Sequence, residues 1–316
     1  MGSKARAIVF GNCQAMALEH VLKASDGFSK RFKVRTFPPV HEITREKVVK
    51  LHASLGQCDL VIAQRVSESY RGLGVGTKTL ASMAPKATLV RWPDAYWGGY
   101  FPDLFYLRDA AGQSVVNGPF DYHDRGILHA FVSGWGVDET IQRLRDPDQP
   151  LTAEEWVRDA RENLQIREHE CDIAISPFVE SAFDSALLFF TMNHPANIVL
   201  KYMAEQVLEL IGLPNELPAR KRLPERLCAT FYPIHANHHR ALGLQFITPD
   251  TYKIRGASYD PRRAVKAFFS YYKAHPELVS LNALGSTRTP EVTESARTRD
   301  DQRDAISAIG GTDPRN

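Results

Sequence analysis

The feature that most constrains the fold is a regular alternation of short β-rich runs and amphipathic segments near the N-terminus. The β-rich runs lie at 7–10, 32–37, 60–63 and 88–90, and helical spacing of apolar residues appears at 14–24 and after Thr44. Strands that alternate with helices pair in parallel through right-handed crossovers. We therefore predict an α/β fold whose first part, residues 1–95, is a small parallel Rossmann-like or flavodoxin-like sheet subdomain.

The pattern changes after about residue 95, where helical periodicity dominates and no repeat period is present. The predicted helices lie at 124–135, 137–145, 152–170, 177–189, 196–212 and 261–274. We predict that residues 96–285 form a predominantly α-helical region that packs on the sheet and does not fold independently. Residues 286–316 are rich in Thr, Arg and Asp with few large apolar side chains, which predicts a disordered tail.

Composition excludes several classes of protein. A net charge of +2 does not favour a dedicated nucleic-acid binder, which needs a concentrated basic face. No apolar run approaches the roughly 18 residues that span a bilayer, and the few residues before the first strand are too short for a signal peptide. We therefore expect a cytoplasmic protein. The four cysteines lack CxxC spacing, and the grouping of His235, His238 and His239 fits no ordinary zinc site, so no metal is predicted.

The segment Gly11-Asn12-Cys13-Gln14 follows the first predicted strand. A parallel sheet opens its ligand crevice at the carboxyl ends of its strands, and the next helix directs free N–H groups and a positive dipole end toward Cys13. These groups favour a thiolate and can form an oxyanion hole, with the side chain of Asn12 or Gln14 contributing. We predict an acidic, nucleophilic Cys13; the structural alternative is a small residue packed under a turn. The other cysteines look structural: Cys58, Cys171 and Cys228.

Three histidines are candidates for a base that takes the thiol proton. His194 precedes Pro195, which suits a first helical position and predicts that His194 is the N-cap. The helix dipole there keeps an imidazole neutral and able to accept a proton; a purely capping role is the alternative. His123, two residues from Asp121, and His41, which follows the second strand, are the other candidates.

A polar loop follows the third predicted strand. Arg65, Arg71 and Lys78 lie in or beside it, where they could hold phosphate groups near a strand end. The segment is not a Walker loop, because no GxxxxGK pattern ends in Ser or Thr. A solvated loop with ordinary surface charges is the alternative.

Several short motifs occur in an order that resembles the WcbI family of capsular polysaccharide biosynthesis proteins, from about residue 7 to about residue 245. Each motif is weak alone, but the ordered set is more specific. The motifs are Gly11-Asn12-Cys13-Gln14, Gln64 with Tyr70-Arg71, Trp92-Pro93, Gly99-Tyr100-Phe101-Pro102-Asp103, Asp121-Tyr122-His123 and Asn193-His194-Pro195.

The resemblance implies a largely helical fold with an α/β subdomain, and an enzyme that binds coenzyme A or acetyl-coenzyme A. It also implies O-acetylation of a capsule sugar with a catalytic triad and an oxyanion hole. The motif positions carry over to Cys13 and His194, while Asp121, His123 and Asn193 remain open as the third member. The residues expected to hold the coenzyme are Gly11, Asn12, Gln14, Gln64, Arg65, Tyr70, Arg71 and Lys78, with aromatics at 96–101 stacking on adenine or sugar.

The leading hypothesis is therefore Cys/His-based acetyl transfer from acetyl-coenzyme A to a sugar hydroxyl in capsular polysaccharide biosynthesis. The expected partners are a sugar or polysaccharide acceptor and, peripherally, the capsule assembly machinery, with no nucleic acid. Two alternatives are a thiol-dependent deacylase or esterase, and a non-catalytic coenzyme A-binding subunit of a capsule assembly complex.

Overall fold

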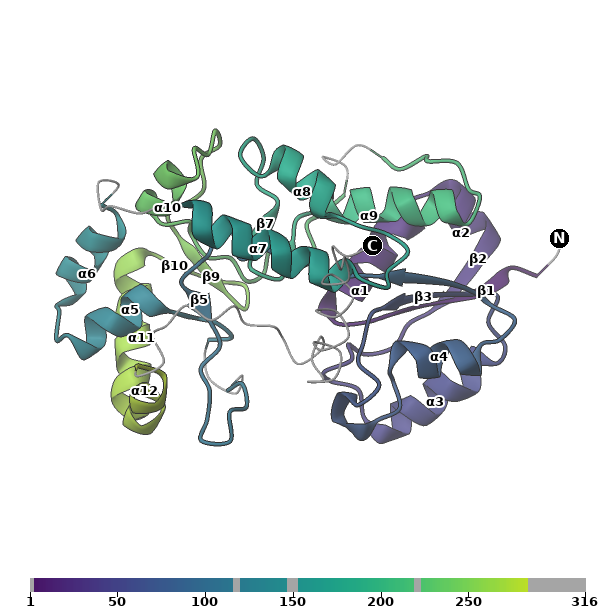
Figure 1. Ribbon diagram of the computed structural model, residues 1–316, viewed down its shortest axis with the longest axis horizontal. Helices are drawn as coiled ribbons and strands as arrows, with labels where there is room; N and C mark the ends of the chain where they lie inside the picture. The colour runs from purple at the N-terminus through teal and green to yellow at the C-terminus, as the bar shows by residue number, and fades with distance from the viewer. Residues whose placement is uncertain (1–2, 116–119, 147–152, 219–222, 284–316) are drawn as a thin grey trace, which may run out of the picture.

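A computed structural model describes residues 3–115, 120–146, 153–218 and 223–283 (Figure 1). The four-stranded sheet and its helices form one end of the molecule, and α5, α6, α10, α11 and α12 gather at the other. Among the described helices, none combines the length and apolar character needed to cross a membrane. The predicted tail, 286–316, lies outside the described residues.

The N-terminal part has the predicted α/β alternation. Its strands pair in parallel in the order β2-β1-β3-β4, which confirms the predicted fold class. The chain leaves β1 toward β2 on one side and later places β3 on the other, so the order reverses at the β1–β3 pair. The elements are β1 (Ala5–Phe10), α1 (Cys13–Lys23), α2 (Asp26–Arg31), β2 (Phe32–Arg35), α3 (Arg45–Leu55), β3 (Leu60–Gln64), a 3-10 turn (Tyr70–Gly72), α4 (Thr77–Met83) and β4 (Thr88–Trp92).

Strand alternation sends successive side chains of β1 to opposite layers. Ala7 and Val9 pack with α1 and α9 in the larger core, whereas Ile8 and Phe10 pack with α3 and α4 in a smaller one. The two helical layers on either face of the sheet are visible in Figure 1. The predicted cap of α3 is confirmed, because the Thr44 hydroxyl accepts a hydrogen bond from the Lys47 N–H.

The second region is mainly helical, as predicted, and its described residues also form three two-stranded antiparallel sheets, β5–β6, β7–β8 and β9–β10. Predicted helices at 124–135, 137–145, 152–170, 196–212 and 261–274 correspond to α5, α6, α7, α9 and α11. The elements are β5 (Leu104–Phe105), β6 (His123–Asp124), α5 (Arg125–Val132), α6 (Val137–Leu144), α7 (Ala153–Glu168), α8 (Ser176–Ala182), β7 (Phe189–Thr191), β8 (His194–Pro195), α9 (Asn197–Leu210), α10 (Ala236–Ala241), β9 (Tyr252–Ile254), β10 (Ala257–Tyr259), α11 (Pro261–Ala274) and α12 (Pro276–Ala283).

Two local predictions in this region are wrong. The helix expected at 177–189 ends at Ala182, because Phe189 enters β7 and pairs with Pro195 of β8. His194 is consequently a strand residue, and Ala196 is the N-cap of α9. The Pro195 ring suits the edge of a two-stranded ribbon as well as a first helical turn.

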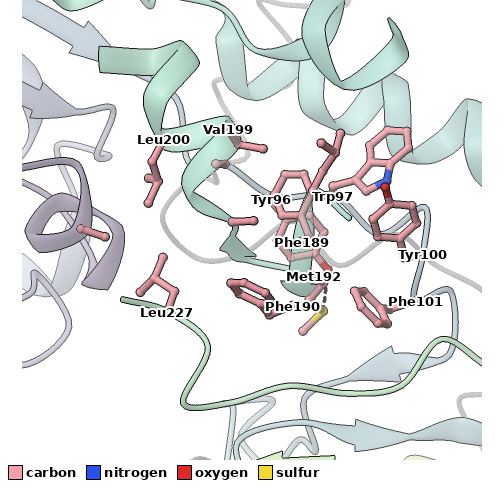
Figure 2. Close-up of a cluster of buried hydrophobic side chains, with 14 of the residues drawn as sticks. Tyr96, Trp97, Tyr100, Phe101, Phe189, Phe190, Met192, Val199, Leu200 and Leu227 are labelled. Carbon is pink, nitrogen blue, oxygen red and sulfur yellow. Dashed lines mark hydrogen bonds between the residues drawn. The ribbon is translucent and has the colours of Figure 1, made fainter. Parts of the chain in front are cut away.

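An aromatic and aliphatic cluster joins the two regions (Figure 2). Tyr96 and Trp97, just after the sheet, pack beside β7, and the Tyr96 hydroxyl lies 3.1 Å from the Met192 sulfur. The Trp97 N–H donates to the Met192 carbonyl at 2.6 Å. Helix α9 also packs on α1. Because α9 belongs to the second region and covers the sheet, the two regions share one core.

Candidate functional site

Cys13 is the first residue of α1, immediately after the β1 turn. The Asn12 side chain caps this helix by accepting the Gln14 N–H at 2.9 Å. The backbone N–H groups of Cys13 and Gln14 hydrogen-bond the sulfur and favour its thiolate form. The cysteine is intermediate in exposure. The predicted placement of the thiol at a helix N-terminus is therefore present in the structure.

The predicted acidity of this thiol is wrong. Burial, followed by the charge of Asp94, raises the pKa of Cys13 to about 12, against the lowering effect of the two backbone donors. The helix terminus alone does not overcome the desolvation of the sulfur. At neutral pH the Cys13 side chain is a neutral thiol, so any reaction at sulfur requires a base that removes the proton as the new bond forms.

Asp94 is the centre of the hydrogen-bond network that holds the turn. Its Oδ1 accepts from Asn12 Nδ2 at 2.9 Å, Gln14 Nε2 at 3.1 Å and Gln64 Nε2 at 3.2 Å. Its Oδ2 pairs with Arg167 of α7 at 3.1 Å, and both charged side chains are buried. The turn after β1, the end of β3 and helix α7 therefore meet at one carboxylate.

The predicted coenzyme residues Asn12, Gln14 and Gln64 have structural partners instead of free polar groups. Gln64 Oε1 accepts the Asn12 N–H at 2.7 Å, and Gln14 Oε1 accepts the Ala95 N–H at 3.0 Å. The amide side chains of Asn12 and Gln14 are thus committed to the turn, which leaves the Cys13 N–H as the candidate oxyanion donor.

A glycine is required at position 11 because the side chains of Gln64 and Trp92 pack closely against its backbone, and not because of an unusual φ. A Cβ at this position would lie 2.7 Å from Gln64 Cβ and 2.8 Å from a ring carbon of Trp92. We expect Gly11→Ala to destabilise the protein by about 2–3 kcal/mol, because a packed core must shift. Urea unfolding measures the change. Gly56→Ala is the matched control, since its Cβ would meet nothing closer than 3.9 Å; an equal loss in both variants would contradict the explanation.

The second half of the site comes from the loops around β6 and β7. The Gln14 side chain donates to the Asn193 carbonyl at 2.8 Å, which ties the start of α1 to the β7–β8 turn. The Tyr122 hydroxyl donates to Asn193 Oδ1 at 2.5 Å and lies 3.5 Å from His194 Nε2. A negative charge on Cys13 opposes ionisation of Tyr122. Tyr122 thus lies within electrostatic range of the thiol and in contact with the imidazole.

His194 is neutral at physiological pH, but the reason differs from the predicted helix dipole. Burial lowers its pKa to about 4, against smaller raising effects of the Thr230 backbone and the Asp121 charge. Asp121 pairs with Arg255 at 2.7 Å at the surface. Asp121, Asn193 and His123 were left open as the third member of the catalytic triad. Asp121 affects the pKa of His194 through its charge, and Asn193 is linked to His194 through the Tyr122 hydroxyl.

His123 lies apart from this group, in the aromatic core of the helical region. Its Nδ1 is 3.1 Å from the Tyr272 hydroxyl, and its ring is 5.7 Å from that of Phe268. Only 1% of the residue is exposed, and burial lowers its pKa to about 3. The predicted catalytic role of His123 has no support in this geometry, because the ring is enclosed by core side chains.

This buried imidazole makes the fold sensitive to acid. Because the folded pKa of His123 lies below its unfolded value of 6.5, its contribution to stability is full above that pH and is lost as pH falls toward 3. Lowering the pH to about 4.5 is expected to cost about 2–3 kcal/mol through His123, at about 1.4 kcal/mol per pH unit. His123→Phe should flatten the pH dependence of urea unfolding between these values. An unchanged pH profile in this variant would contradict the assignment.

The loops at the carboxyl edge of the sheet converge, as predicted. The Val40 N–H donates to the Gly11 carbonyl at 2.8 Å, and the Arg71 guanidinium donates to the His41 carbonyl at 2.8 Å. The His41 ring is 3.5 Å from Glu42 and half exposed. His41 thus borders the turn on a loop that also carries the charge of Glu42, which opposes ionisation of Cys13.

The predicted phosphate-binding cations are only partly available. Arg65 lies 3.7 Å from Glu170, and Arg71 is bound to the loop carbonyl. The N-terminus of α4 already holds an anion, because Glu68 accepts the N–H groups of Lys78 and Thr79 at 2.7 and 3.1 Å. Tyr70 begins the 3-10 turn beside these residues. The loop is therefore a folded, internally paired segment rather than an open phosphate cradle.

Sequence reasoning missed Asp94, Arg167 and Tyr122 as parts of the site. Asp94 directly follows the Trp92-Pro93 motif, and Tyr122 is the middle residue of the Asp121-Tyr122-His123 motif. A buried carboxylate directly after the last parallel strand, at the same edge as Cys13, is a signal that could have identified Asp94.

Comparisons with known proteins agree with this fold. The family described as "Polysaccharide biosynthesis enzyme WcbI" matches residues 6–216. A solved structure of WcbI, described as a novel polysaccharide biosynthesis enzyme, superposes with a TM-score of 0.76 at 19% identity, covering 98% of this chain and 100% of its own. That structure is described as the native protein without a disulfide bond between coenzyme A and one of its cysteines. No curated protein matches the sequence. The chain belongs to the WcbI family of polysaccharide biosynthesis enzymes.

Proposed function

We propose that this enzyme binds coenzyme A beside Cys13 and transfers the acetyl group of acetyl-coenzyme A to a sugar hydroxyl in capsular polysaccharide biosynthesis. The observation that carries the proposal is that the helix start bearing a partly exposed thiol is tied through Gln14 to the loop of Asn193 and His194, with Tyr122 within electrostatic range of the sulfur. The solved WcbI, described as the native protein without a disulfide bond between coenzyme A and one of its cysteines, supports the choice of coenzyme.

In the first step, His194 takes the proton from the Cys13 thiol while the sulfur attacks the thioester carbon of acetyl-coenzyme A. The Cys13 N–H, at the positive end of α1, stabilises the oxyanion. The carbon–sulfur bond to coenzyme A then breaks, and the imidazolium returns its proton to the departing sulfur. The products are free coenzyme A and an acetyl thioester on Cys13.

In the second step, His194 takes the proton of the sugar hydroxyl while its oxygen attacks the acetyl group. The bond to Cys13 breaks, and the proton returns to the cysteine sulfur. Burial lowers the pKa of His194 to about 4, which makes its imidazole a weak base. Both the Cys13 thiol and the His194 imidazole are neutral at the start of the reaction. The thiol therefore gives up its proton to the imidazole as the sulfur attacks, and the attraction between the developing opposite charges helps this transfer.

The experiment is incubation with acetyl-coenzyme A, with and without a panel of free and nucleotide-activated sugars, followed by mass spectrometry of protein and products. We expect acetyl-Cys13 without acceptor, and its loss with formation of an O-acetyl sugar when the right acceptor is present. Acetate released at the same rate without any sugar would identify a deacylase instead. Binding of coenzyme A without either product would identify a non-catalytic subunit.

The proposed location and partners follow from this activity. We propose that the enzyme works in the cytoplasm, where acetyl-coenzyme A and activated sugars are made, and associates peripherally with the capsule assembly machinery. The acceptor is a sugar or a growing polysaccharide.

A further inference from the structure

A cavity lies in the helical region, among elements at the end of the molecule opposite the four-stranded sheet (Figure 1). Its volume is about 470 Å³, within the range of small-molecule sites. Cys13 and His194 are absent from its lining. Its walls are mostly apolar and come from α6, β9, α11 and the loops around α10: Ile141, Leu144, Pro233, Ile234, Tyr252, Pro261 and Val265.

The polar anchor of this cavity is His235. Its Nε2 lies 2.7 Å from Asp124 Oδ2, and its side chain is only 10% exposed. Asp124 is itself fixed, because its Oδ1 accepts the Ile127 N–H at 3.0 Å and caps α5. With Nε2 engaged, Nδ1 is the ring nitrogen left for the cavity, and it has no hydrogen-bond partner within the described ranges. The carboxylate thus orients a nearly buried imidazole whose second nitrogen is available to a ligand.

The charge around the cavity favours an anion. Burial alone lowers the pKa of His235, but the charge and hydrogen bond of Asp124 outweigh it, with smaller contributions from Asp103 and Asp250, and leave the pKa raised. The ring is therefore biased toward its protonated form, in which Nδ1 donates. Arg145 and Arg240 also line the cavity, whereas Asp250 is the one acidic residue among its described lining residues and pairs with Arg145.

We propose that this cavity is a second ligand site, which binds a small amphipathic organic anion. The anionic oxygen accepts a hydrogen bond from His235 Nδ1, and the apolar body packs against Ile141, Leu144 and Val265. Charge-assisted hydrogen bonds are stronger than neutral ones, so the anionic group sets the orientation while the apolar walls supply contact area. This site is independent of the acetyl-transfer proposal, because it shares no lining residue with the Cys13 site.

Isothermal titration calorimetry of the whole protein with octanoate and with 1-octanol tests the proposal, because the two probes share a chain length and differ in the anion. We expect octanoate to bind at least about 10-fold more tightly than octanol, which corresponds to about 1.4 kcal/mol. Equal affinities, or tighter binding of octanol, would overturn the assignment, since His235 would then not act as a donor to an anion.

Two variants locate the binding. His235→Gln keeps a donor to Asp124 but removes the charge, and should reduce the octanoate preference to about threefold or less. Thr248→Trp, at a partly exposed lining position, should abolish binding of both probes by filling the cavity. The controls are His169→Gln and Ser82→Trp, both exposed and outside the cavity, which should leave octanoate binding unchanged. Unaltered octanoate binding in Thr248→Trp would place the probe elsewhere and overturn the proposal.

Discussion

Replacing Cys13 by alanine is expected to reduce acetyl transfer at least about a thousandfold, because the covalent route loses its nucleophile. Binding of coenzyme A, measured by calorimetry, should change far less, since the backbone of the turn is held by Asn12, Gln64 and Asp94 and not by the sulfur. The rate of O-acetyl sugar formation from acetyl-coenzyme A is the measurement.

Cys171→Ala is the matched control for this experiment. Cys171 has the same class of exposure as Cys13, and burial likewise raises its pKa to about 12. It lies after α7, where its thiol donates to the Arg167 carbonyl at 3.4 Å. We expect its removal to leave turnover within about twofold. Full turnover in Cys13→Ala would exclude the covalent route and leave direct transfer, in which His194 activates the sugar hydroxyl.

The Arg167→Met variant is expected to destabilise the protein by about 3–5 kcal/mol, because it leaves the buried Asp94 carboxylate without its cationic partner. The side chains of Arg167 and Asp94 are 2% and 7% exposed, so water replaces little of the lost interaction. Urea unfolding followed by circular dichroism measures the change in the free energy of unfolding.

Arg161→Met is the control on the same helix. Arg161 pairs with Glu180 at 2.9 Å, but both side chains are about two-fifths exposed, at 43% and 38%. Exposed pairs contribute about 1 kcal/mol or less. Adding Asp94→Asn to Arg167→Met should recover part of the loss, since the stranded charge is removed. Equal losses in the two arginine variants would show that helix packing, and not the ion pair, accounts for the effect.

The sheet and most of the helices could be predicted from the sequence, because the apolar patterns that identify them are local and periodic. Helix α11 begins and ends where it was predicted, with Asp260 as its cap and Pro261 in its first turn. Strands β1 and β3 were found because their apolar runs are buried on both faces of the sheet, whereas β2 was found from its alternation of apolar and charged residues. The β1–β3 reversal point then placed Cys13 and Gln64 at the same edge.

The errors arose where the outcome depends on distant contacts. Pro195 gave a helix-start signal, but the pairing of β8 with β7 decided the conformation of His194. The acidity of Cys13 was inferred from its own helix, whereas burial and the charge of Asp94 set its pKa. Neither the Asp94–Arg167 pair nor the Gln14–Asn193 bond follows from any period in the sequence, because the partners are 73 and 179 positions apart.

The hydrogen bond between Gln14 and Asn193 has a consequence for the order of events during synthesis. A chain emerging from the ribosome makes Cys13 early, but the partner loop that carries Asn193 and His194 follows much later. The start of α1 therefore lacks its Asn193 contact, and the protein lacks His194, until the polypeptide is well over half made. A truncated product that retains the sheet alone would lack Asn193 and His194 and also α9, the helix that packs on α1, so the site and the core of the sheet are completed together.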